Sequence, residues 1–309
     1  MKILKNILLV LSTGYIFVYF SEHLFWARIR PDDSLGGWLG AWVAYTFLAF
    51  VFLTLIAYFK IKNIWSLFLV GAAFGWLAEG VIVQTTYESL PLSISFTGLA
   101  WHALITIWIG WYALRKSFFS IASFSTVKLS AVIGACYGLW AIAWWSEPDG
   151  GVSSLVDFAA FSLVTTILVI LAYGLANWSA TEPFLPDCRV TLGISLLFIL
   201  YFLFVAVPAA PLALIILPLL LGLVYFGLRR TRLAAADLSM INELTGNIPA
   251  WNFLSLLALP VTGILVYWIA LSLNLHWHTN WILYLIATPL GFILFGLSLY
   301  RSWRNESAS

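Results

Sequence analysis

Charged side chains are scarce in this sequence of 309 residues. Asp, Glu, Lys and Arg together make up 9% of the chain, whereas hydrophobic residues make up 62%. Soluble domains carry about 25% charged residues, so this composition excludes an ordinary water-soluble fold. The net charge of +2, with basic residues scattered rather than gathered into a large patch, gives no reason to expect a nucleic-acid partner.

Cysteine and histidine are almost as scarce, with two and four copies. Cys136 falls inside an apolar stretch and Cys188 in a polar connection, so we expect no disulfide between them. The chain contains no HExxH, CxxC or GxSxG pattern. These absences argue against the usual zinc and nucleophile motifs, and we predict no metal site.

Apolar stretches fill most of the chain. A spanning helix needs about 20 mostly apolar residues, and about ten such stretches follow one another. Their approximate bounds are 4–20, 36–58, 64–86, 92–114, 128–145, 155–177, 190–207, 211–228, 251–273 and 279–300. We therefore predict an all-α fold, a polytopic transmembrane helix bundle of about ten spanning helices. The proline-bounded connection 208–211 leaves open whether the seventh and eighth stretches are separate helices.

The basic residues are distributed unequally between the two sides of the predicted membrane. If the N-terminus is cytoplasmic, all but two of the 15 Lys and Arg residues fall on the cytoplasmic side, and the exceptions are Arg28 and Arg30. The positive-inside rule then predicts that both termini are cytoplasmic, in what we expect to be a prokaryotic cytoplasmic membrane. The first stretch resembles a signal peptide but lacks a small-x-small cleavage site, so we interpret it as an uncleaved helix.

We predict a single membrane domain over 1–309, with a possible internal repeat. The tetrapeptide 24–27 (LFWA) precedes a Pro-Asp pair and a long span, and 139–141 (LWA) does the same. This echo suggests units of about 1–116 and 117–232, followed by a final helical hairpin over 250–301. Such repeats are frequent in transporters.

Two ionisable residues fall well inside the predicted spans, Glu79 and His102. An ionisable side chain in a bilayer costs at least about 2.5–3.5 kcal/mol and indicates a functional site by default. Helix rise places Glu79 about 10 Å and His102 about 15 Å from the outer ends of adjacent helices. Small residues share the face of each and allow the helices to approach closely. If those two faces meet, the side chains of Glu79 and His102 can hydrogen-bond; whether they touch is left open. A structural polar clamp is the competing interpretation.

The loop above this pair contains Gln84, Tyr87 and Glu88. We predict that these side chains form the mouth of a polar pocket that opens to the extracytoplasmic side, with Glu79 and His102 at its floor.

The outer loops supply secondary candidates. These are Glu22, His23, Arg28, Asp157, His276 and His278. The first three belong to a mixed-charge segment that is also explained as solvated ion pairs. Asp157 is explained as a helix N-cap residue, and the two histidines point the same way only in an extended segment.

Three functions remain open. The first is a membrane transporter or solute-binding protein in which Glu79 exchanges a proton or binds a cation. The second is an intramembrane enzyme in which the Glu–His pair performs acid–base chemistry on a lipid or lipid-linked substrate from the outer leaflet. The third is a non-catalytic assembly subunit. Membrane lipids and a small-molecule or lipid substrate are the expected partners, while the cofactor and oligomeric state are left open.

Overall fold

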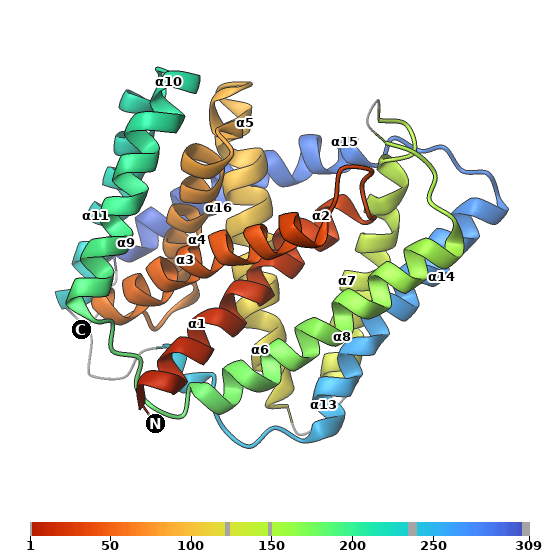
Figure 1. Cartoon of the computed structure of the whole chain (residues 1–309), viewed down its shortest axis with the longest axis horizontal. Helices are drawn as coiled ribbons and strands as arrows, with labels where there is room; N and C mark the ends of the chain where they lie inside the picture. Colours follow the sequence, from red (N-terminus) through yellow and green to blue (C-terminus); the bar gives the residue numbers. More distant parts are fainter. Residues whose placement is uncertain (1, 121–123, 148–149, 234–239, 305–309) are drawn as a thin grey trace.

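The computed structural model describes residues 2–120, 124–147, 150–233 and 240–304, and this part of the chain is helical without any strand (Figure 1). Ten helices are long and apolar enough to cross a membrane. Their bounds are Lys2–Trp26 (α1, η1 and α2), Leu35–Phe59 (α3), Ile64–Ile82 (α4 and η2), Leu92–Phe118 (α5, η4 and α6), Phe124–Ala143 (α7), Leu155–Ser179 (α8), Cys188–Ala209 (α9, η5 and α10), Ala213–Leu233 (α11), Ala250–Ser272 (α13, η6 and α14) and Asn280–Arg304 (α15, η7 and α16). Two short helices lie in connections, η3 (Thr85–Tyr87) and α12 (Met240–Glu243). The prediction of an all-α bundle is confirmed, and the seventh and eighth stretches are separate helices.

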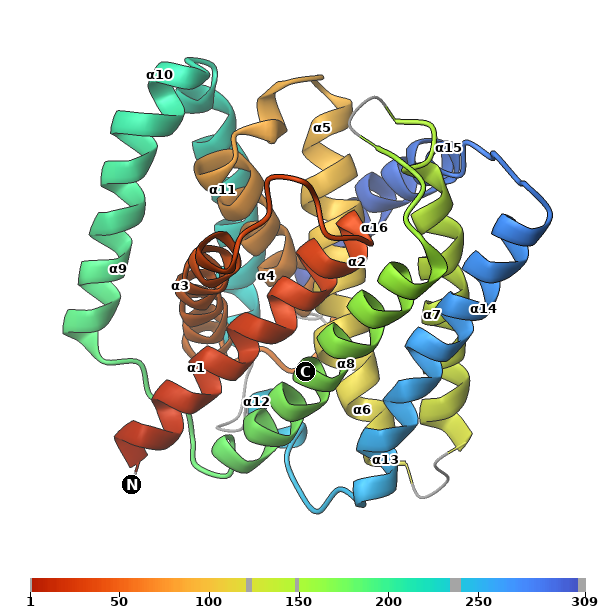
Figure 2. The same cartoon turned by 45° about the vertical axis from the view of Figure 1, so that its right-hand side comes forward.

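The ends of the helices gather on two opposite sides. In Figure 2 the N-terminus, α6 and α13 lie at the lower end, and α5, α10 and α15 lie at the upper end. We call these sides the N-terminal face and the distal face. The basic-residue pattern predicts that the N-terminal face is cytoplasmic.

Helix α4 (Ile64–Leu77) is the centre of the bundle. In the span that begins with it, 83% of the most apolar window is buried, compared with 6% in the span that begins with α9. α4 packs against η4 (Phe96–Leu114), α3, α11 and α16, whereas α7, α8 and α14 form a second group. Helix α1 contacts both α3 and α8 and therefore joins the two groups. The internal repeat stays a prediction.

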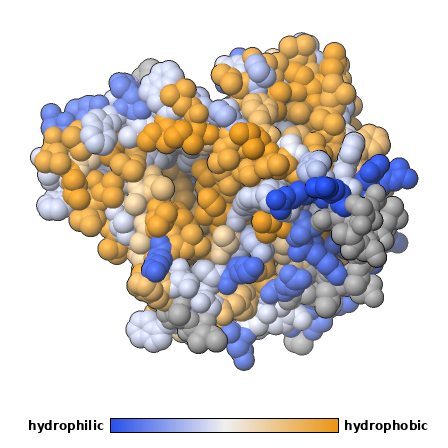
Figure 3. Space-filling model, turned by 180° about the vertical axis from the view of Figure 1, so that it is seen from behind, coloured by the Kyte–Doolittle hydropathy of each residue, from blue (hydrophilic) through white to orange (hydrophobic). Residues whose placement is uncertain are grey.

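The outer surface of the bundle is apolar. Figure 3 shows that hydrophobic residues cover most of the face seen from behind, while hydrophilic residues gather toward its edges. Side chains such as Phe204 and Leu219 are 75% and 64% exposed. A surface of this kind is unfavourable in water and is matched by lipid chains, since a continuous apolar patch of this extent is not tolerated on soluble monomers.

The connection 240–252 is attached to the N-terminal face of the bundle by hydrogen bonds. The Arg115 guanidinium, itself buried, donates to the Leu244 carbonyl at 3.0 Å. The buried Asn252 amide donates to the Phe118 carbonyl at 2.7 Å. These bonds hold the connection against the ends of η4, α6 and the spans beside them.

Close helix packing depends on glycine at several crossings. At Gly134 in α7, a Cβ atom would overlap the backbone carbonyl of Leu259 in α14, whereas at Gly174 in α8 it would meet nothing within 4 Å. We expect Gly134→Leu to destabilise the fold by about 1–3 kcal/mol through overpacking. Gly174→Leu, the matched control, is expected to be neutral or stabilising because leucine favours helix. Unfolding temperatures in detergent measure both, and equal temperatures for the two variants would contradict this packing.

Candidate functional site

The structure brings Glu79 and His102 into contact. The imidazole Nε2 lies 2.7 Å from a carboxylate oxygen of Glu79, and the two residues are 2% and 9% exposed. Glu79 belongs to η2 (Ala78–Ile82) and His102 to η4, and both segments are π-helical. π-helical turns are frequent at functional sites because they re-aim side chains out of the regular helical positions.

Glycine explains how these helices approach each other. A Cβ atom on Gly75 would overlap the Gly98 carbonyl and come within 2.9 Å of the His102 Cβ. The stripes of small residues predicted from the sequence therefore face each other, as membrane helix interfaces require.

The pair is part of a longer chain of polar contacts. His102 Nδ1 lies 3.0 Å from the Ser21 hydroxyl, which also lies 3.0 Å from the Thr106 hydroxyl. The Tyr45 ring lies beside the imidazole, with ring centroids 6.4 Å apart. Tyr45 donates to Glu22 at 2.6 Å. We call these five residues, Glu79, His102, Ser21, Tyr45 and Glu22, the polar network. The sequence analysis did not single out Ser21 or Tyr45, because hydroxyls inside apolar helices carry no signal until the helices are packed.

The network ends near the distal face on both sides. The Thr85 hydroxyl donates to the second carboxylate oxygen of Glu79. At the other end, the Trp26 indole N–H donates to Glu22 at 3.1 Å. Both oxygens of each carboxylate are thus engaged, which is the condition for holding such groups among apolar helices.

The three residues predicted at the pocket mouth lie in the loop above Glu79, but two of them are occupied with backbone groups. Gln84 donates to the Val81 carbonyl at 2.6 Å. Tyr87 donates to the Gly80 carbonyl at 2.8 Å, and burial raises the pKa of Tyr87 to about 12, so its hydroxyl remains a neutral donor. Glu88 is exposed.

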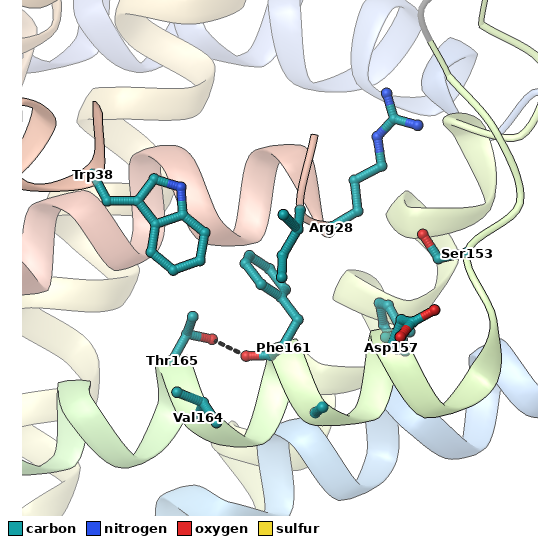
Figure 4. A pocket seen from close by; sticks show the side chains of 10 residues that line it. Arg28, Trp38, Ser153, Asp157, Phe161, Val164 and Thr165 are labelled. Carbon is teal, nitrogen blue, oxygen red and sulfur yellow. Dashed lines mark hydrogen bonds between the residues drawn. The ribbon is translucent and has the colours of Figure 1, made fainter. Parts of the chain in front are cut away.

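Two adjoining cavities of about 250 and 450 Å³ open near the distal face, between η1, α3 and α8. They share Arg28, Trp38 and Phe161 in their walls, and we call them together the distal pocket (Figure 4). Glu22 and His23 line the smaller cavity, and Asp157 lines the larger one.

The floor of this pocket differs from the prediction. Neither Glu79 nor His102 lines either cavity, and the buried pair lies beyond Tyr45. Glu22 and His23 are not loop residues, as expected from the sequence, but belong to η1 (Tyr19–His23), a π-helical continuation of α1. The helix continues because Tyr45 and Trp26 satisfy the Glu22 carboxylate.

Aromatic rings form the inner wall of the distal pocket. The His23 ring lies edge-on to Trp38 and to Phe161, with centroids 5.5 and 5.6 Å apart. In Figure 4, Trp38, Phe161 and Val164 line one end, and Arg28, Ser153 and Asp157 lie toward the other. The pocket is therefore amphipathic along its length.

Several charges near this pocket are engaged within the fold. Arg30 Nη2 lies 2.9 Å from the Asp33 carboxylate. Although burial of Asp33 opposes ionisation, the backbone N–H and guanidinium of Arg30 hold the pKa of Asp33 below its usual range. The prediction that Asp157 is the N-cap residue of α8 is wrong, because Ser154 takes that position and its hydroxyl accepts from the Asp157 backbone N–H at 3.1 Å. Asp157 lies in the first turn, where its carboxylate accepts from the Ser154 hydroxyl at 2.6 Å.

The two C-terminal histidines lie apart from this site. His276 is exposed, bonds Asn274 at 3.2 Å, and lines neither cavity of the distal pocket; His278 is exposed as well. Within the described ranges, no group of three His, Cys, Asp or Glu side chains is placed to hold a metal ion.

The buried contact predicts energetic coupling between Glu79 and His102. Changing either residue to Leu leaves the other polar group unsatisfied, so the Glu79→Leu/His102→Leu double variant is expected to lose less stability than the sum of the singles, by about 0.5–3 kcal/mol. The control pair, exposed Glu88→Leu with His102→Leu, is expected to be additive. Reversible unfolding in detergent measures both cycles, and additivity in the first would contradict the contact.

No protein-family model matches this chain, and no match was found to a curated protein or to a solved structure. Ten apolar helices identify it as a membrane protein by length and composition, and any finer function has to be argued from its own side chains.

Proposed function

We propose that this protein is an integral membrane transporter or solute-binding protein that takes its solute into the distal pocket. One observation carries the proposal: the hydrogen bonds of the buried Glu79–His102 pair adjoin the Tyr45–Glu22 hydrogen bond at the pocket wall. His102 is bonded to Ser21, the residue next to Glu22 in the chain, and its ring lies beside the Tyr45 ring. Ionisable residues inside membrane spans typically belong to proton relays or to substrate and ion pathways.

Proton exchange is the chemistry that suits this network. A neutral imidazole donates from one ring nitrogen and accepts at the other. While Nε2–H donates to an ionised Glu79, Nδ1 accepts from Ser21. When a proton enters at Nδ1, the Nε2 proton passes to Glu79, so that Nδ1–H donates to Ser21 and the Glu79 carboxyl O–H donates to Nε2. Both states keep each ring nitrogen bonded, so a proton can enter without leaving an unsatisfied buried group.

The difference between the two faces of the bundle favours transport by alternating access over passive conduction through a pore. The distal pocket is open, whereas the connection 240–252 is bonded across the N-terminal face through Arg115 and Asn252. Access from one side at a time is the arrangement of an alternating-access transporter. A continuous aqueous pore would need both faces open.

An enzyme acting on an amphiphile of the outer leaflet is the second candidate. Its support is the larger cavity, which runs from Ser153 and Asp157 to apolar Val164 along α8. The Glu79–His102 pair has the groups for acid–base chemistry. Because Tyr45 and Ser21 separate the pair from the pocket wall, the relay role fits the geometry better.

Protonation within the network is testable without knowing the solute. As pH falls, we expect infrared difference spectra of the reconstituted protein to show a buried carboxyl band that is lost in Glu79→Gln. Tyr45→Phe should shift that band, because it removes the hydroxyl that donates to Glu22 from a ring that lies beside His102. Glu88→Gln, which alters an exposed carboxylate, should leave it unchanged. An identical band in wild type and Glu79→Gln would contradict proton binding by Glu79.

Solute binding is expected to depend on Trp38. A panel of amino acids, sugars, organic cations and lysophospholipids can be screened by thermal shift. A compound that stabilises the wild type should bind Trp38→Ala at least about tenfold more weakly, since a buried aromatic contact is worth about 2 kcal/mol or more. Trp251→Ala, at a residue 72% exposed, is the control.

Uptake of such a compound into proteoliposomes tests its coupling to the polar network. Uptake that continued unchanged in Glu79→Gln would contradict that coupling.

A further inference from the structure

A further groove lies away from the distal pocket, near the N-terminal face. It has a volume of about 660 Å³ and runs between α1, α3 and α9. Figure 2 shows α9 standing apart from α1 and α3 on that side of the bundle. Because α9 has no buried residue in its described helix, the groove lies at the periphery of the bundle, on the side of the surrounding membrane.

The groove changes character along its length. Lys2 and Asn6 line it near the N-terminal end of α1, which lies at the N-terminal face, and Val10, Phe50 and Ile194 line it further along α1, α3 and α9. The distance along α1 from Lys2 to Leu11 is about 14 Å, from a rise of about 1.5 Å per residue. This is close to half of the roughly 30 Å hydrocarbon core of a bilayer. The groove thus has a polar mouth and an apolar interior one leaflet deep.

Helix α9 cannot close this groove by packing. None of its described residues is buried, and its contacts to α3 are few. An apolar space open to the bilayer is filled by hydrocarbon, because water would lose its hydrogen bonds there. An acyl chain is the occupant that the walls fit, and it would support α9 where the protein does not.

The charged side chains at the mouth determine which kind of lipid headgroup is favoured there. Lys2 is exposed there, and Lys5 nearby bonds Thr181 at 2.8 Å. The Asp187 carboxylate at the same end is engaged with the backbone N–H of Arg189 and Val190, at 2.8 and 3.2 Å. The accessible ammonium of Lys2 favours an anionic headgroup, as basic side chains at membrane surfaces do.

We propose that this groove binds one anionic phospholipid from the leaflet on the N-terminal side. Its phosphate lies at Lys2, beside the Asn6 amide, which donates to the Leu185 carbonyl at 3.3 Å. An acyl chain lies between α1 and α9 along Val10 and Ile194. This site is separate from the distal pocket and does not depend on the proposed transport function.

Native mass spectrometry of the whole protein tests the site. After delipidation, the protein is titrated with palmitoyl-oleoyl phosphatidylglycerol, with the phosphatidylcholine of the same chains, and with inorganic phosphate. We expect one tightly retained phosphatidylglycerol, weaker phosphatidylcholine, and no displacement by phosphate. Lys2→Gln should weaken phosphatidylglycerol binding about fivefold, since one basic residue contributes about 1 kcal/mol. Lys128→Gln, at an exposed lysine outside the groove, is the charge control.

A substitution that fills the groove distinguishes lipid bound in this site from lipid that adheres elsewhere on the apolar surface of the protein. Ile194→Trp is expected to remove the retained lipid, whereas Leu219→Trp, on a lipid-facing surface of α11, should keep it. Equal retention in these two variants, equal retention of both lipids, or no retained lipid in the wild type would overturn the proposal. Displacement by inorganic phosphate would reduce the site to an anion contact and overturn it as well. Unfolding temperatures near that of the wild type establish that both variants are folded.

Discussion

The contact between Glu79 and His102 is the interaction on which the rest of the site depends. Inside a bilayer no water is present to satisfy a carboxylate, so a partner has to come from a neighbouring helix. That partner reaches Glu79 only because Gly75 and Gly98 let the two backbones approach closely. The same requirement then extends outward. His102 needs a partner for Nδ1 and finds Ser21, and Glu22 is satisfied by Tyr45 and Trp26.

Helix α1 and its π-helical continuation η1 connect the buried pair with the distal pocket. Ser21 faces His102, Glu22 faces Tyr45, and His23 faces Trp38 and Phe161. A regular helix turns each successive side chain by about 100°, so three consecutive residues can reach three different neighbours. Because α1 also packs against both α3 and α8, any shift between the two helix groups would move the pocket wall and the network together.

The sequence predicted the helices well because hydropathy along the chain determines spanning segments directly. It also placed Glu79 and His102 at similar depth on helix faces with small residues, but whether the two faces meet was settled only by the packing seen in the structure. It failed where partners are set by packing between distant segments. Ser21 and Tyr45 resemble ordinary helix residues in the sequence, and Glu22 resembles a loop residue until Tyr45 is seen to satisfy it. Gln84 and Tyr87 were interpreted as pocket groups, whereas the π-helical turn at η2 exposes backbone carbonyls that take their hydrogen bonds.

The connection 240–252 is held at the N-terminal face by a buried cation, Arg115. Arg115 is 3% exposed, and its described partners are the Leu244 carbonyl at 3.0 Å and the Trp111 ring, 5.1 Å from the guanidinium carbon. Within the described ranges, no carboxylate pairs with it. A buried cation held by a carbonyl and a ring recovers less of its desolvation free energy than one paired with a carboxylate. If the connection 240–252 moved away, rehydration of the Arg115 guanidinium would therefore recover part of the free energy lost with the packing contacts. An attachment built in this way is less stable than one held by an ion pair, so the connection 240–252 is the part of this face that costs least to displace.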